Sequence, residues 1–107
     1  MVEQAVELAV RSYLAAVREA GIGATRAVLF GSYARGDADE WSDIDIVVIA
    51  PEFDGPPDSE LVNKLWTLRV YTDSRIEPIP CGEKRWETED GSPLLEIARR
   101  EGIVIAA

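Results

Sequence analysis

The sequence predicts a small α/β domain: a mixed sheet of about four strands, with helices packed mainly against one of its faces. Two short apolar runs, residues 27–30 and 46–50, have the composition of buried strands. Two longer segments, residues 3–20 and 59–70, repeat apolar side chains every three or four positions, which is typical of amphipathic helices. At 107 residues, the chain is expected to form a single domain over residues 1–107 with one core.

The first third of the chain is predicted to hold a helix, a strand and a tight turn. The helix over residues 3–20 ends at Gly21, and its apolar face carries Val6, Val10, Tyr13, Leu14 and Val17. The first strand is expected at residues 25–30. Residues 32–36 should form a helical turn whose N-terminal amides would point at an anion.

The middle of the chain continues the alternation of strands and helices. The second strand is expected at residues 46–50, followed by a loop dense in proline and glycine at residues 51–58. The helix over residues 59–70 places Leu61, Leu65 and Leu68 on one face. Residues 74–80 alternate well enough for a third strand, and its two prolines place the later part at a sheet edge or a strand end.

The last third of the chain is predicted to end on a helix and a short strand. Residues 81–91 are polar and irregular, with Trp86 as an anchor. Ser92 can cap a helix that has Pro93 at its first position and ends at Gly102. A final short strand is expected at residues 103–106.

The chemistry of the chain is concentrated at residues 31–50. Gly31-Ser32 stands where the first strand ends, in a place suited to holding phosphate. Asp43 and Asp45 enter the second strand, where residues i and i+2 face the same side about 7 Å apart. Carboxylate oxygens bind hard cations, and two metal ions about 3.5–4 Å apart can clamp the attacking and leaving oxygens of phosphoryl transfer. A phosphate turn beside two carboxylates predicts a nucleotide site.

These residues also carry a family resemblance. Gly31-Ser32 with Gly36 completes G-S-x-x-x-G, and after ten residues Ser42 and the two aspartates complete S-D-x-D. This pattern resembles the signature of nucleotidyltransferases of the DNA polymerase beta superfamily, and the match is close to its minimal nucleotidyltransferase (MNT) branch. The resemblance covers nearly the whole chain and implies the nucleotidyltransferase fold. Its specific part is the pairing of Gly-Ser with Asp-x-Asp.

The resemblance also implies roles for single residues. Gly31 and Ser32 would bind the triphosphate, with Arg35 assisting. Asp43 and Asp45 would hold Mg²⁺, with two ions expected and ATP as substrate.

Glu77 would be the third carboxylate of the site, as a metal ligand or a base. Most family members have aspartate there, and glutamate reaches one methylene further. Asp54 and Asp73 lie in or near loops and are the next candidates if Glu77 has no such role.

Composition excludes several other functions. The chain has no histidine, which removes Ser-His-Asp and Cys-His catalysis and histidine-based zinc sites. Its one cysteine, Cys81, fits a reducing compartment. A net charge of −9 would repel a polyanion, so no direct binding of nucleic acid is expected. No apolar run suits a membrane helix and no secretory signal is present, so a cytoplasmic location is expected.

The functional prediction is an enzyme that moves a nucleoside monophosphate, AMP from ATP, to an acceptor hydroxyl with release of pyrophosphate. No extra domain that could hold a small acceptor is expected within these 107 residues. The MNT resemblance implies a protein partner, a HEPN-type ribonuclease toxin that this protein would modify as its antitoxin. Two alternatives stay open: a partner-binding antitoxin with a vestigial nucleotide site, or a nucleotidyltransferase subunit acting on a small molecule. The sequence leaves a homo-oligomer and a hetero-oligomer equally open.

Overall fold

The computed structural model describes residues 3–88 and 91–107, and a mixed sheet forms the centre of this described part. The sheet has four strands in the order β3-β2-β1-β4. Their bounds are β1 (Arg26–Phe30), β2 (Ile44–Ile49), β3 (Ile76–Cys81) and β4 (Ile103–Ala106). β1 runs antiparallel to both β2 and β4, whereas β2 and β3 are parallel. The predicted fold class is confirmed.

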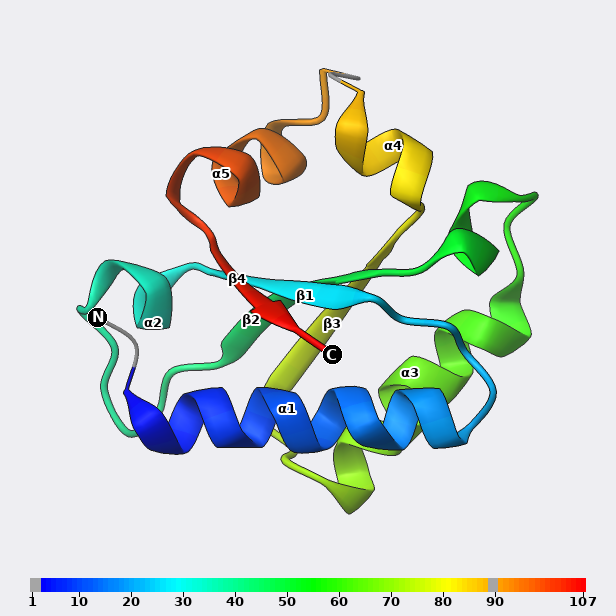
Figure 1. Cartoon of the computed structure of the whole chain (residues 1–107). Helices are drawn as coiled ribbons and strands as arrows, with labels where there is room; N and C mark the ends of the chain where they lie inside the picture. The colour runs from blue at the N-terminus through cyan, green and yellow to red at the C-terminus, as the bar shows by residue number, and fades with distance from the viewer. Residues whose placement is uncertain (1–2, 89–90) are drawn as a thin grey trace.

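Helices cover the two faces of the sheet unequally (Figure 1). The long helices α1 (Gln4–Glu19) and α3 (Ser59–Tyr71) cover one face, as predicted. On the other face, α4 (Glu83–Glu87) and α5 (Pro93–Glu101) pack over one part of the sheet, around the buried residues Val28, Val47, Ile49, Cys81, Leu95 and Ala98. Near the starts of β2 and β3, Asp45 and Glu77 lie on that second face and are only half-buried, which makes this its more open end.

The larger part of the core lies between α1, α3 and the sheet. The predicted apolar face of α1 is buried at all five positions, and strand residues such as Leu29, Ile46 and Ile76 pack against it. Tyr13 donates its hydroxyl proton to the Leu65 carbonyl oxygen at 2.7 Å, which ties α1 to α3. Burial raises the pKa of Tyr13, so this phenol stays protonated.

Two short helices lie where the sequence predicted irregular structure. The 3₁₀ helix η1 (Pro51–Asp54) occupies the start of the proline-rich loop, and α4 lies within residues 81–91. The Asp54 carboxylate accepts hydrogen bonds from the backbone N–H groups of Lys84, at 3.1 Å, and Arg85, at 3.4 Å. The residue that caps α4 therefore lies 30 residues earlier in the chain. For this reason the sequence around residues 83–87 contains no capping signal that would predict the helix. Residues 89–90 of that predicted irregular stretch lie outside the described residues.

The helices of residues 3–88 and 91–107 include none with the length and apolarity needed to cross a bilayer.

Candidate functional site

The pairing of the strands brings the predicted carboxylates to one place. Asp45, near the start of β2, is paired with Phe30 at the end of β1 and with Glu77 on β3. Paired residues of neighbouring strands point to the same face, so Asp45 and Glu77 lie side by side on the face opposite α1 and α3. Asp43 is exposed and comes immediately before β2, whereas Asp45 and Glu77 are half-buried. The structure therefore places all three at the open end of the second face.

The three carboxylates repel one another. Burial raises the pKa of Asp45, and the charge of Asp43 raises it further. Burial also raises the pKa of Glu77, with added contributions from the charges of Asp43 and Asp45 and from a hydrogen bond with Asp43. Within residues 3–88 and 91–107, none of these carboxylates forms an ion pair. The site therefore has excess negative charge that a cation would neutralise.

The donor set suits Mg²⁺, although the carboxylates are not gathered into a closed cage. Carboxylate oxygens are the ligands that this hard cation prefers, and Mg²⁺ is usually held by one or two carboxylates together with substrate phosphates. In the described part of the chain, no group of three or more acidic or cysteine side chains is arranged to hold a metal ion. Joint ligation of one ion by all three carboxylates would therefore need a rearrangement of these side chains. The metal roles of Asp43, Asp45 and Glu77 stay predictions.

Gly31 brings the backbone of the predicted phosphate turn against Asp45. Its φ of 77° and ψ of −154° lie in a region that is essentially open only to glycine. A Cβ atom at this position would lie 2.5 Å from Asp45 Oδ2, closer than side chains allow. The turn continues into α2 (Ser32–Arg35), which ends at Gly36 in the left-handed conformation. Glycine is therefore required both by the turn and by the carboxylate beside it.

Ser32 and Arg35 lie at the two ends of α2. Ser32 is half-buried, and its hydroxyl makes no side-chain hydrogen bond to any described residue. Arg35 is exposed and forms ion pairs with Asp37, at 3.2 Å, and Glu101, at 3.3 Å. Its charge partly offsets the raised pKa of Asp45, so Arg35 lies within electrostatic reach of that carboxylate. The triphosphate-binding roles of Gly31, Ser32 and Arg35 stay predictions. To bind a phosphate, Arg35 would have to break its ion pairs with Asp37 and Glu101.

The two fallback candidates for a third carboxylate have other partners. Asp73 forms an ion pair with Arg75 at 2.8 Å, and this contact lowers the pKa of Asp73. Asp54 caps α4 at the opposite end of β2 from Asp45. Glu77 is therefore the better placed acid.

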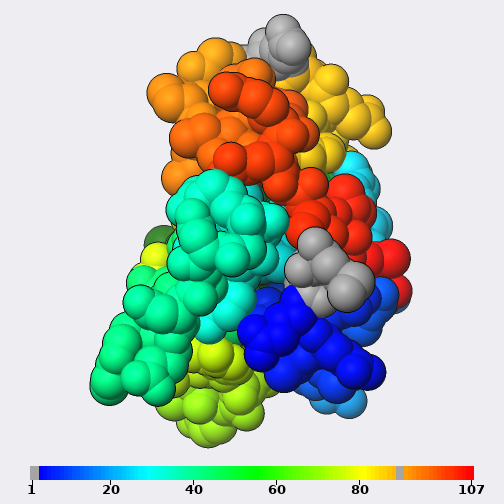
Figure 2. Space-filling model, turned by 90° about the vertical axis from the view of Figure 1, so that its left-hand side faces the viewer, coloured from blue at the N-terminus to red at the C-terminus, as the bar shows by residue number. Residues whose placement is uncertain are grey.

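A polar network that sequence reasoning missed surrounds the same end of the sheet. Arg75 donates to the Tyr33 hydroxyl oxygen at 3.2 Å, and that hydroxyl donates to the Asp39 carbonyl oxygen at 3.3 Å. The three residues lie in separate segments of the chain, so no spacing in the sequence links them. Figure 2 shows α2 and the following loop as a continuous ridge that runs down to the yellow-green segment before β3.

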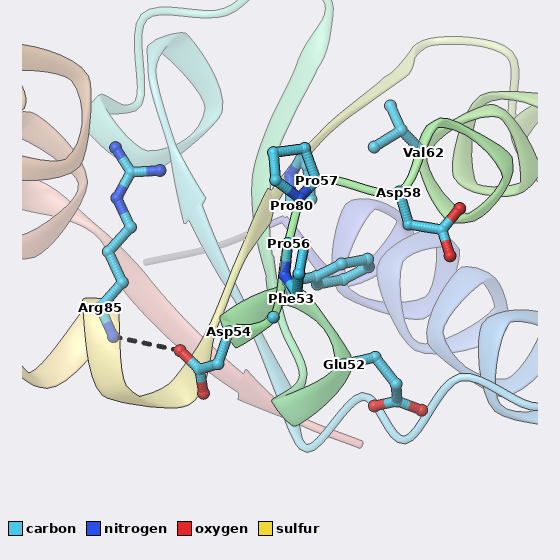
Figure 3. Close-up of a pocket in the computed structure, with 10 residues that line it drawn as sticks. Glu52, Phe53, Asp54, Pro56, Pro57, Asp58, Val62, Pro80 and Arg85 are labelled. Carbon is cyan, nitrogen blue, oxygen red and sulfur yellow. Dashed lines mark hydrogen bonds between the residues drawn. The ribbon is translucent and has the colours of Figure 1, made fainter.

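A surface cavity of about 380 Å³ lies at the far end of β2, away from the carboxylates (Figure 3). Its middle is apolar, formed by Phe53, Pro56, Pro57, Pro80 and Val62. Its two aspartates are occupied as helix caps, Asp54 for α4 and Asp58 for α3. Its other charged lining residues are Glu52, whose Oε2 accepts from the backbone N–H of Gly23 at 2.7 Å, and Arg85. The cavity contains neither the Gly31-Ser32 turn nor any of the three predicted carboxylates.

The fold and this site define a class of protein, and comparison with known proteins agrees. The family model described as "Nucleotidyltransferase domain" matches residues 10–92, so the chain belongs to this family. A solved structure of a "putative nucleotidyltransferase" from Sulfolobus solfataricus superposes with a TM-score of 0.63 over 92% of this chain and 78% of that chain. At 15% sequence identity, this likeness concerns the fold alone.

A more specific likeness covers half of the chain. The "Putative protein adenylyltransferase" of Methanocaldococcus jannaschii is 42% identical over 55 residues, which are 50% of this chain and 56% of that protein. The match therefore spans only about half the length of the archaeal relative.

Proposed function

We propose that this protein is a Mg²⁺-dependent adenylyltransferase that moves AMP from ATP to a hydroxyl group on a protein partner. The contact between Gly31 and Asp45 carries the proposal, because it presses a glycine turn against a carboxylate that is paired across the sheet with Glu77. Membership of the nucleotidyltransferase family supports nucleotidyl transfer in general. The relative from Methanocaldococcus jannaschii is named as a protein adenylyltransferase, which supports a protein acceptor.

The roles follow from the chemistry of each group. Gly31 and Ser32 would hold the triphosphate, through backbone amides and the free hydroxyl of Ser32. Asp43 and Asp45, with Glu77 beside them, would hold Mg²⁺, which supplies charge neutralisation to the triphosphate when bound. Glu77, paired with Asp45 across the sheet, is also placed to accept the proton of the acceptor hydroxyl.

The transfer forms one bond and breaks another. The acceptor oxygen attacks the α-phosphorus of ATP, and the bond from that phosphorus to the oxygen bridging toward the β-phosphate breaks. The acceptor proton passes to a carboxylate, and pyrophosphate leaves with the electron pair of the broken bond. The protein's own contribution is positioning and charge stabilisation, as in other phosphoryl transfers.

The partner would be a protein with a basic surface. A net charge of −9 steers this chain toward such a surface, at a rate that falls as salt is added. The MNT resemblance points to a HEPN-type ribonuclease toxin, whose RNA-binding surface would be basic. AMP on a tyrosine hydroxyl near the toxin's active site would block RNA binding, so this protein would act as its antitoxin.

The test is mass spectrometry of the partner after co-expression. An adduct of one or more AMP groups is expected with the wild-type protein and should be absent with Asp43→Asn or Asp45→Asn. Glu40→Gln is the matched control, because Glu40 is an exposed acid three residues from Asp43, and the adduct should survive it. An unmodified partner held inactive in a tight complex would instead favour the non-catalytic antitoxin, which is consistent with carboxylates that are not preassembled.

A further inference from the structure

We propose that Arg75 is a positioning residue that holds the phosphate turn and the loop before Asp43 in place through Tyr33 and Asp39. This role rests on the proposed function, because the segments it anchors carry the nucleotide-binding residues. The name "anchor network" is used below for Asp73, Arg75, Tyr33 and Asp39.

Several hydrogen bonds hold the base of the anchor network, Asp73 and Arg75. Asp73 accepts from Arg75 Nε at 3.0 Å and from Nη2 at 2.8 Å, a two-point contact that fixes the plane of the guanidinium. The same carboxylate accepts from the backbone N–H of Arg75 at 3.0 Å. In addition, the carbonyl oxygen of Arg75 accepts from the backbone N–H of Ile44 at 2.8 Å. Arg75 is therefore fixed at the point where β2 and β3 begin.

From this base the anchor network reaches the phosphate turn. The remaining Nη1 group of Arg75 donates to the hydroxyl of Tyr33 at 3.2 Å, and the guanidinium lies 6.0 Å from the centre of the Tyr33 ring. Tyr33 is in α2, directly after Ser32. A displacement of Arg75 would therefore move Tyr33, the neighbour of Ser32, which is proposed to bind phosphate.

The anchor network ends in the loop that leads to Asp43. The Tyr33 hydroxyl donates to the carbonyl oxygen of Asp39, and the backbone N–H of Ser42 donates to the same oxygen at 3.1 Å. The Asp39 carboxylate accepts from the backbone N–H of Trp41 at 2.9 Å and from the Ser42 hydroxyl at 3.3 Å. The loop is thus closed on Asp39 immediately before Asp43. One arginine links the phosphate turn, the Asp43 loop and the start of the strand that carries Glu77.

The experiment compares three changes to the anchor network with a structural control. Arg75→Met removes the donors, Arg75→Lys keeps the charge without the two-point fork, and Tyr33→Phe removes only the hydroxyl. The control is Arg99→Met, because Arg99 is also tied by several bonds, to the backbone carbonyls of Arg85, Trp86 and Thr88, but it joins α4 to α5. Two quantities are measured: amide hydrogen exchange in the ligand-free protein, and the affinity for α,β-methylene-ATP with Mg²⁺.

In Arg75→Met and Tyr33→Phe, faster amide exchange is expected at residues 31–43 and unchanged exchange at residues 93–101. In Arg99→Met, faster exchange is expected at residues 93–101 and unchanged exchange at residues 31–43. Nucleotide affinity should fall roughly 10- to 100-fold in Arg75→Met, the usual effect of removing a group that orients metal ligands, and Arg75→Lys should not restore it.

Four results would count against the positioning role. Full recovery by Arg75→Lys would show that only the charge matters, and uniformly faster exchange would show a general loss of stability; either overturns the proposal. A wild-type protein that binds no nucleotide would overturn the proposed function and the positioning role with it. Wild-type binding that Arg75→Met leaves intact would overturn the positioning role alone.

Discussion

At the scale of single residues, the site depends on how closely Gly31 approaches Asp45. The side chain of Asp45 occupies the space where any other residue at position 31 would place its Cβ atom. The carboxylate therefore lies directly against the turn, and a ligand that bridges phosphate and metal would contact both. Two substitutions test this contact: Gly31→Ala tests the need for glycine in the backbone of the turn, and Asp45→Asn tests the effect of the carboxylate charge.

Gly31→Ala should destabilise the protein and abolish nucleotide binding. The backbone conformation alone costs roughly 1–3 kcal/mol for a residue with a Cβ atom. The new methyl group would also collide with Asp45 Oδ2. Gly21→Ala is the matched control, because Gly21 has a φ of 94° but nothing within 4 Å of the added Cβ. Urea unfolding should show a loss in both variants, whereas titration with α,β-methylene-ATP should fail only for Gly31→Ala; equal binding by the two would contradict the contact.

Asp45→Asn should stabilise the ligand-free protein at neutral pH. Because burial and the charge of Asp43 raise the pKa of Asp45, the folded protein binds this proton more tightly than the unfolded chain does. Stability is therefore lost as the pH rises past the ordinary carboxyl pKa of 3.8, and the substitution removes that loss. The variant's advantage in melting temperature should be present at pH 7 and vanish below about pH 4.

Asp73→Asn provides the opposite sign as a control for that measurement. The hydrogen bond from Arg75 lowers the pKa of Asp73, so its contribution to stability is present at neutral pH and is lost as the pH falls. Asp73→Asn should melt below the wild type at pH 7, with the difference shrinking in acid. If Asp45→Asn melted below the wild type at pH 7, as Asp73→Asn should, the raised pKa of Asp45 would be wrong.

At the scale of elements, the parts that sequence could predict are those whose signal is local. The helices over α1, α3 and α5 and the four strands follow from apolar spacing and from caps within the same segment, such as Ser92 before α5. The pairing of Asp45 with Glu77 was consistent with the motif, but it needed the parallel register of β2 and β3 to become visible. Helix α4 and the role of Arg75 were missed, because each depends on partners about 30 to 40 residues away.

Asp54→Ala tests the distant cap of α4. Losing a capping carboxylate costs about 0.5–2 kcal/mol, because backbone N–H groups lose their acceptor. Urea unfolding should show this loss, while nucleotide affinity should match the wild type, since Asp54 lies at the far end of β2. Asp58→Ala removes the equivalent cap of α3 and should lower stability by a similar amount. A large drop in nucleotide affinity for Asp54→Ala alone would mean that this end of the sheet also contributes to the site.

At the scale of the whole molecule, the chain has a net charge of −9, to which Asp43, Asp45 and Glu77 contribute without an ion pair to any described residue. Mg²⁺ should therefore stabilise the protein more than Na⁺ at equal ionic strength. A ligand that binds only the folded state at 100 times its Kd contributes about 2.7 kcal/mol. Thermal unfolding in MgCl₂ and in NaCl of matched ionic strength measures the difference, which should disappear in the double variant Asp43→Asn with Asp45→Asn. Equal stabilisation of the wild type by the two salts would show that Mg²⁺ acts only by screening charge and not by binding at the carboxylates.

The buried position of Cys81 makes the molecule convenient for spectroscopic labelling. It is the chain's one cysteine, it is 1% exposed, and its burial keeps thiol reagents away while the protein is folded. Trp41, by contrast, is 85% exposed and lies in the loop before Asp43. A Trp41→Cys variant would therefore carry a single reactive thiol beside the carboxylates. A spin label attached there would report the distance to a bound Mn²⁺ ion by paramagnetic broadening, without any change to the native cysteine.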